Sequence, residues 1–153
     1  AFLIHTAGGC LFHAAGVVRD LQGYIFFGPS GAGKTTVTQL SQGKLVLNDD
    51  LLVLLPHGHK WMAFSTPFSN ETPEERSNLM MPVSGLYYLV KDRFVFVRTM
   101  SPGEAFGAVI AGVPVLPLLA QFDGLMERCL RICEDIPVFE LHFRQDPSFW
   151  DVI

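Results

Sequence analysis

The sequence predicts an α/β fold in which helices flank a sheet, and three features lead to that prediction. Short apolar runs suited to buried strands recur along the 153 residues. Segments with helix-capping signals lie between some of these runs. A glycine-rich loop, GPSGAGKTT, stands between an apolar run at residues 24–28 and an expected helix at residues 34–42. We expect one domain over residues 1–153, and a start at Ala1 rather than methionine leaves room for upstream residues.

Composition and charge exclude several classes of protein. Hydrophobic residues make up 49% of the chain and charged residues 17%, which is typical of a folded globular domain. The net charge is −4, without a basic block, so we expect no nucleic-acid partner. The uncharged run at residues 105–122 contains two glycines and two prolines, and it predicts two core elements joined at residues 112–114 rather than a membrane span.

The cysteines and the order of elements complete this outline. Cys10, Cys129 and Cys133 are interpreted as free, mostly buried thiols rather than a metal or redox pair, which favours a cytoplasmic location. Strands are expected at residues 10–13, 15–20, 24–28, 45–48, 51–56, 61–66 and 138–143, with a break at 14–16 and a turn at 21–23. A polar surface loop is expected at residues 65–82, a hairpin of strands 85–90 and 93–98, helices from Ser101 and over 116–133, and a last helical turn at 147–153.

The glycine-rich loop matches the pattern GxxxxGK[ST] in its required context, after an apolar strand and before a helix. Glycines there allow backbone N–H groups to turn toward phosphate oxygens. Lys34 would reach the outer phosphates, and the Thr35 hydroxyl would bind Mg²⁺. The nucleotide-binding residues are therefore predicted to be Gly28, Ser30, Gly31, Ala32, Gly33, Lys34, Thr35 and Thr36.

Two adjacent carboxylates, Asp49 and Asp50, follow the loop closely. If the helix after the loop crosses to a parallel neighbouring strand at residues 45–48, both acids lie beside the phosphates at the same sheet edge. One would then help to hold Mg²⁺, and the other would take a proton from an acceptor hydroxyl. The alternative is a solvated turn, which Asn and Asp favour.

These motifs, with a histidine-bearing strand before them, resemble the nucleotide-binding core of the HPr kinase/phosphorylase family. The matching segments are Leu11-Phe12-His13, the loop, and Asn48-Asp49-Asp50, all within residues 5–50. The resemblance is to the shorter kinases of biosynthetic clusters in particular, and ATP-dependent phosphoenolpyruvate carboxykinase has a similar loop and acidic motif. It implies the mixed sheet with flanking helices of the HPr kinase C-terminal and carboxykinase type. A later HPr-kinase signature, with a metal-binding Glu beside an Arg-Gly segment, is absent from the sequence.

The resemblance also implies a reaction. ATP, with Mg²⁺, would give its γ-phosphoryl group to a serine-like hydroxyl on a small molecule, peptide or protein. Asp50 would be the general base, Asp49 its partner on the metal side, and His13 would lie near the transferred phosphate. Relatives in this family often form oligomers, so the resemblance is compatible with a homo-oligomer. The competing interpretations are a nucleotide-binding regulatory module without turnover and a plain nucleoside triphosphatase.

Other candidate residues favour structural roles. His57 and His59 are expected in an exposed turn rather than at a metal. Trp61, Phe64 and Phe68 are expected in the core rather than under a nucleotide base. Arg76 is expected in solvent, and Arg98 could face either the site or solvent.

Overall fold

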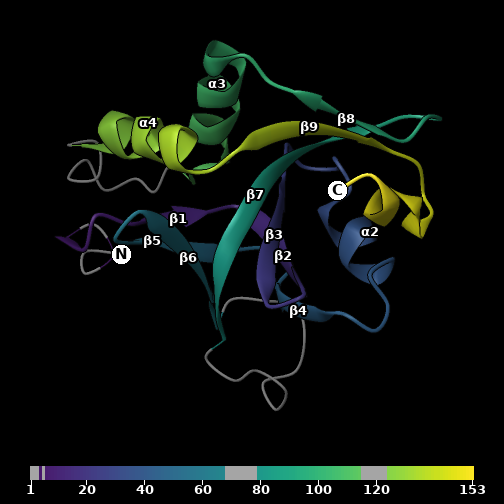
Figure 1. Ribbon diagram of the computed structural model, residues 1–153, viewed down its shortest axis with the longest axis horizontal. Coiled ribbons are helices and arrows are strands. Elements are labelled where there is room, and N and C mark those ends of the chain that lie inside the picture. Colours follow the sequence, from purple (N-terminus) through teal and green to yellow (C-terminus); the bar gives the residue numbers. More distant parts are fainter. Residues whose placement is uncertain (1–3, 5, 68–78, 115–123) are drawn as a thin grey trace.

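A computed structural model describes residues 4, 6–67, 79–114 and 124–153 of the chain. Its described part is a mixed sheet with helices on both faces, as predicted (Figure 1). The strands are β1 (Cys10–Phe12), β2 (Ala14–Arg19), β3 (Gln22–Phe27), β4 (Leu45–Asn48), β5 (Leu52–His57), β6 (Lys60–Ser65), β7 (Met80–Lys91), β8 (Phe96–Thr99) and β9 (Val138–Phe143). The helices are α2 (Lys34–Gln39), α3 (Pro102–Gly112), α4 (Leu125–Asp135) and the 3₁₀-helix η3 (Pro147–Asp151).

The long strand β7 joins two parts of the sheet. The strand order is β1-β5-β6-β7-β3-β2-β4, and β9 pairs with both β7 and β8. The start of β7 pairs antiparallel with β6, whereas its later residues pair parallel with β3 and β9. Because β3, β7 and β9 run the same way, their carboxyl ends meet at one edge of the sheet.

Strand β4 reaches that same edge, although not as expected. The predicted parallel neighbour of β3 is instead paired antiparallel with β2, which lies between β3 and β4. Two antiparallel pairings in succession leave β3 and β4 pointing the same way. The residues that follow each strand therefore lie at one edge, for a different topological reason from the one predicted.

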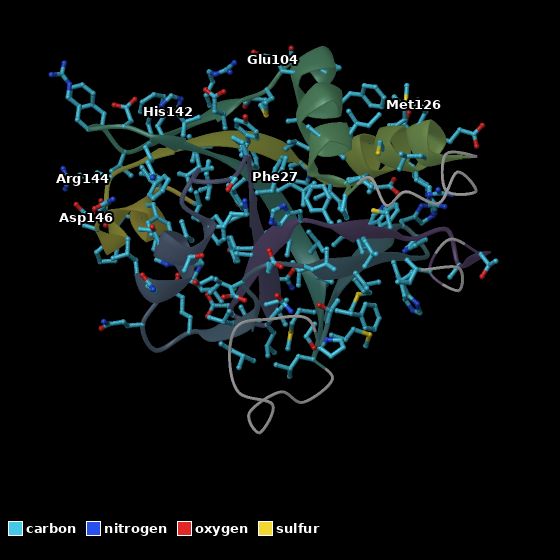
Figure 2. All side chains as sticks on the ribbon, turned by 180° about the vertical axis from the view of Figure 1, so that it is seen from behind. Phe27, Glu104, Met126, His142, Arg144 and Asp146 are labelled. Atoms are coloured by element: carbon cyan, nitrogen blue, oxygen red, sulfur yellow. The ribbon has the colours of Figure 1, made fainter. Side chains whose placement is uncertain are left out.

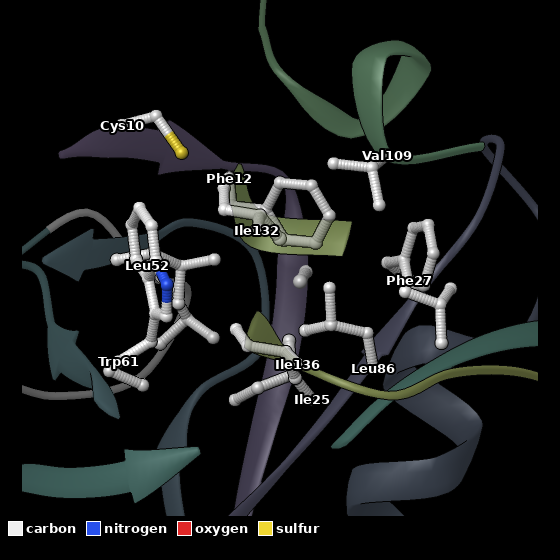
Figure 3. Packing of buried hydrophobic residues seen from close by; sticks show 14 of the residues in the cluster. Cys10, Phe12, Ile25, Phe27, Leu52, Trp61, Leu86, Val109, Ile132 and Ile136 are labelled. Atoms are coloured by element: carbon white, nitrogen blue, oxygen red, sulfur yellow. The ribbon is translucent and has the colours of Figure 1, made fainter. Parts of the chain in front are cut away.

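Apolar side chains alternate between two cores on the opposite faces of the sheet. On β3, Ile25 and Phe27 face the first core, where they pack with Phe12, Val109 of α3 and Ile132 of α4 (Figure 3). Phe26 faces the second core, where Val37 of α2 and the two aromatic residues of η3, Phe149 and Trp150, cover the sheet. In Figure 2, Phe27 lies in the middle of the molecule and Met126, on α4, at its periphery.

Several predicted boundaries are wrong, because they depend on strand pairings that local sequence patterns do not show. The hairpin of 85–90 with 93–98 is wrong, because β9 lies between β7 and β8. The strand break falls at His13 rather than at 14–16, and the turn after β2 is at Asp20 and Leu21, both with positive φ. Helix α2 ends at Gln39, before the predicted residue 42.

The expected loop at 65–82 and helix at 116–133 lie partly outside the described residues. Within the described part, β7 already begins at Met80, and Thr66 is buried rather than on the surface. Helix α4 begins only at Leu125. Across 4, 6–67, 79–114 and 124–153, no helix is both long and apolar enough to cross a bilayer.

The structure agrees with the prediction of free, mostly buried thiols. All three cysteines are free, and Cys10 and Cys129 are buried. Burial raises the pKa of Cys10 to about 12 and that of Cys129 to about 11, with their neighbouring thiols adding to the rise. These groups therefore stay protonated and behave as small apolar side chains.

Candidate active site

Nearly all of the predicted site residues lie at one edge of the sheet, around a pocket of ≈ 310 Å³. The loop follows β3, the two aspartates follow β4, and His13 directly precedes β2, whose start lies at the same edge because β2 is antiparallel to both. The lining comprises His13, Ser30, Gly31, Gly33, Lys34, Thr35, Thr36, Asp49, Asp50 and Lys91. Gly28 and Ala32 belong to the loop but do not line the pocket.

The loop keeps its shape through glycine conformations that other residues rarely adopt. Gly31 and Gly33 have φ angles of 79° and 114°. A Cβ atom on Gly33 would lie 2.6 Å from Cζ of Phe143, so the loop also needs glycine for its close approach to β9. Helix α2 begins immediately afterwards, at Lys34.

Lys34 is held inside the loop. Its Nζ donates to the Gly28 carbonyl oxygen at 2.9 Å and to the Pro29 carbonyl oxygen at 3.2 Å. Burial lowers the pKa of the Lys34 ammonium, while the Asp50 carboxylate acts in the opposite direction. Among the described residues, the Lys34 ammonium bonds only to these neutral carbonyls, so it has much to gain from an anion such as phosphate.

His13 and Asp50 form a pair beside the loop. The Nε2 atom of His13 lies 2.9 Å from Oδ1 of Asp50, with 43% and 56% of the two side chains exposed. The backbone holds both ends: the His13 N–H donates to the carbonyl oxygen of Gly112 at 2.8 Å, and the Ala14 N–H donates to that of Asp50 at 3.1 Å. The pair is thus fixed in place while a second molecule can still reach it.

Asn48 supports the turn that carries the two aspartates. It is buried, and its Oδ1 accepts from the backbone N–H groups of Asp50 at 2.9 Å and Leu51 at 3.1 Å. Its Nδ2 donates to the backbone oxygen of Thr66 at 3.0 Å, and the Thr66 hydroxyl donates to the Leu51 oxygen. The turn is therefore braced from its buried side by Asn48, while the Asp50 side chain remains exposed.

Asp49 supplies the feature that best fits a cation. Its Oδ1 is buried and has no hydrogen-bond partner in the described structure, which is costly for a carboxylate unless a further group binds it. Mg²⁺ in nucleotide sites takes one or two carboxylates together with phosphate and water oxygens. Asp49 and the Thr35 hydroxyl fit that requirement. Among the described residues, no group of three or more His, Cys, Asp or Glu side chains could hold a metal by itself.

Lys91 and the bracing role of Asn48 are missed by sequence reasoning. Lys91 ends an apolar strand, and only the knowledge that β7 lies parallel beside β3 would have drawn attention to it.

The remaining candidates lie away from the pocket. His57 and His59 are exposed at the β5–β6 turn, and Trp61 is buried in the core, as expected. Phe64 is half-buried and lines an apolar cavity on β5, β6 and β7. Arg98 pairs with Glu104 and Glu140 and does not line the pocket. Arg76 and Phe68 lie outside the described residues.

Comparison with known proteins gives only a distant similarity. No protein-family model matches the chain, and no curated protein matches it. Among solved structures, the chain is similar to the HPr(Ser) kinase/phosphatase from Coxiella burnetii, with 15% identity and a TM-score of 0.49 over 88% of this chain and 85% of that chain. At these values the similarity says nothing about side chains, so function has to be inferred from the site itself.

Proposed function

We propose that the protein is a Mg²⁺- and ATP-dependent kinase that transfers the γ-phosphoryl group to a serine-like hydroxyl. The observation that carries this proposal is the shared pocket of the glycine-rich loop and the His13–Asp50 pair. The loop offers backbone N–H groups and a lysine to phosphates. The pair offers a proton acceptor at the same opening, which simple nucleotide binding would not need.

Lys34 and the loop would bind the β- and γ-phosphates. Asp49 and Thr35 would hold Mg²⁺, which when bound neutralises charge on the phosphate oxygens. This assignment agrees with the unpartnered Oδ1 of Asp49.

Asp50 would act as the base. As the acceptor oxygen forms its bond to the γ-phosphorus, its proton would pass to Asp50 and the bond to the ADP oxygen would break. His13 contacts Oδ1 of Asp50, which leaves Oδ2 for the acceptor hydroxyl. His13 would thereby orient the carboxylate, as the brace from Asn48 does from the backbone side.

The test compares Asp50→Asn with a matched control, Asp20→Asn. Asp20 lies in the β2–β3 turn, at the far end of β2 from His13, so this control changes the same charge outside the pocket. With γ-labelled ATP and Mg²⁺, transfer to free serine and to serine-containing peptides should fall about 10²- to 10⁴-fold in Asp50→Asn. Asp20→Asn should transfer as the unmodified chain does, and both variants should still bind MgATP.

Other outcomes contradict parts of the proposal. Unchanged transfer by Asp50→Asn would refute the assignment of the base. Tight MgATP binding without transfer to any acceptor would favour a regulatory module. Release of labelled phosphate to water alone, at a rate that acceptors do not change, would favour a nucleoside triphosphatase.

A further inference from the structure

We propose that Lys91 is a second phosphate-binding cation, which contacts the terminal phosphate of the nucleotide from the side opposite His13 and Asp50. This inference depends on the proposed use of ATP. It starts from the pocket lining, in which Lys91 is the one residue contributed by β7 among those described.

The register of β7 against β3 places Lys91 beyond the end of β3, where the loop starts. Phe27, the last residue of β3, pairs with Tyr88 of β7, so Lys91 lies three residues further along. At about 3.3 Å per residue, this extends β7 by about 10 Å beyond the end of β3, alongside the loop. Backbone atoms of Leu89 lie 3.7 and 3.8 Å from the position of a Cβ atom on Gly28, so the two segments are already in contact there.

Strand alternation places Lys91 on the loop side of the sheet. Tyr87 and Leu89 belong to the core that α2 covers, and Lys91 follows them on the same face. His13 directly precedes β2, and Asp49 and Asp50 follow β4; both strands lie on the other side of β3 in the sheet. A phosphate group above the loop would therefore have Lys91 on one flank and the acidic pair on the other.

The backbone of Lys91 is fixed by its neighbours. Lys91 pairs with Phe143 of β9, the residue whose ring lies against Gly33 of the loop. The next residue, Asp92, donates its N–H to the Phe143 oxygen at 2.9 Å and accepts from the Phe94 N–H at 3.1 Å. Its other carboxylate oxygen lies 2.9 Å from Nδ1 of His142.

The charge of Lys91 is free to act in the pocket. Its ammonium has no hydrogen bond or ion pair with any described residue, whereas Asp92 beside it is fully engaged. The transferred phosphoryl group carries charge on three oxygens, which Lys34 alone does not surround. A cation on the opposite flank would stabilise that charge and hold the group toward Asp50.

The test measures the affinity for MgATP and for MgADP by calorimetry in Lys91→Gln, Lys91→Arg and Lys60→Gln. Lys60 is exposed at the β5–β6 turn and serves as the matched control. Loss of a charge-assisted contact to the terminal phosphate should weaken MgATP binding about tenfold in Lys91→Gln, and MgADP binding much less. Lys91→Arg should retain most of the MgATP affinity, and Lys60→Gln should bind both nucleotides normally.

Three results would overturn the inference, and they can be told apart. If Lys34→Ala abolishes MgATP binding but Lys91→Gln binds it normally, Lys91 has no role at the phosphate and the proposed function stands. A raised KM for the acceptor alone in Lys91→Gln would likewise refute the phosphate assignment. If the unmodified chain does not bind MgATP, both this inference and the proposed function fail.

Discussion

Gly33 combines a positive φ angle with the closest contact at an added Cβ atom among the three loop glycines. Its φ angle of 114° is unfavourable for any L side chain, and a Cβ atom there would meet the ring of Phe143 at 2.6 Å. Phe143 is only 1% exposed and cannot easily move aside. Gly31 has a positive φ of 79° but nothing within 4 Å of a Cβ atom, so it isolates the effect of the backbone angle.

We therefore expect Gly33→Ala to destabilise the fold more than Gly31→Ala. Backbone strain alone should cost about 1 kcal/mol in Gly31→Ala. Overpacking against Phe143 should add about 1–3 kcal/mol in Gly33→Ala. Urea unfolding of both variants measures the two free energies. Equal losses would show that the loop can move away from β9 and that the contact with Phe143 is not restrictive.

At this scale the sequence predicts residues that belong to a continuous motif and misses those that depend on long-range pairing. The loop, Asp49 and Asp50 can be recognised because the residues that carry their chemistry are adjacent in the sequence. Asn48 is part of the quoted motif, but its role follows from Thr66, which is 18 residues away. Lys91 has no local signal, because its place at the pocket depends on the pairing of β7 with β3.

Helix α3 begins where its sequence predicts. The Ser101 side chain accepts from the Glu104 N–H at 3.4 Å, and the Glu104 carboxylate accepts from the Ser101 N–H at 2.8 Å, which completes the expected capping box. Tertiary structure adds what local sequence does not show. Arg98 of β8 also contacts Glu104, at 3.2 Å, and ties the strand to the helix.

This cap makes stability depend on pH. Hydrogen bonding by Arg98, and then by Ser101, lowers the pKa of Glu104 from 4.5 to about 2. A lowered carboxyl pKa means that its stabilising contribution is complete above the unfolded value and is lost as pH falls toward about 2. Between pH 6 and pH 3, the free energy of unfolding should therefore fall less in Glu104→Gln than in the unmodified chain. Thermal unfolding at the two pH values measures the difference, and an identical loss in both proteins would contradict it.

Other elements show why strand existence is easier to predict than strand pairing. Apolar runs identify β3, β4 and β9 close to their observed bounds. The partner of β7 cannot be found this way, because β9, which lies between β7 and β8, follows both α3 and α4 in the sequence. Short local turns favour a hairpin, whereas burial of the helices against the sheet favours the observed order.

For the whole molecule, the site lies where the chain passes between two parts of the sheet. β1 pairs with β5, whereas β2 pairs with β3 and β4, and His13 is the one residue between β1 and β2. Gly112, at the end of α3, lies against Phe12 and accepts from the His13 N–H. The mixed sheet with flanking helices agrees with the prediction, but this position of His13 requires the complete topology.

The central claim is that the loop holds a triphosphate whose terminal phosphorus faces Asp50. A crystal structure with Mg²⁺ and a non-hydrolysable ATP analogue tests it most directly. The account predicts the analogue in the loop, Mg²⁺ on Asp49 and Thr35, and room for one hydroxyl group between Asp50 and the terminal phosphorus. An analogue bound elsewhere, or bound in the loop with Asp50 turned away from its terminal phosphorus, would contradict the account.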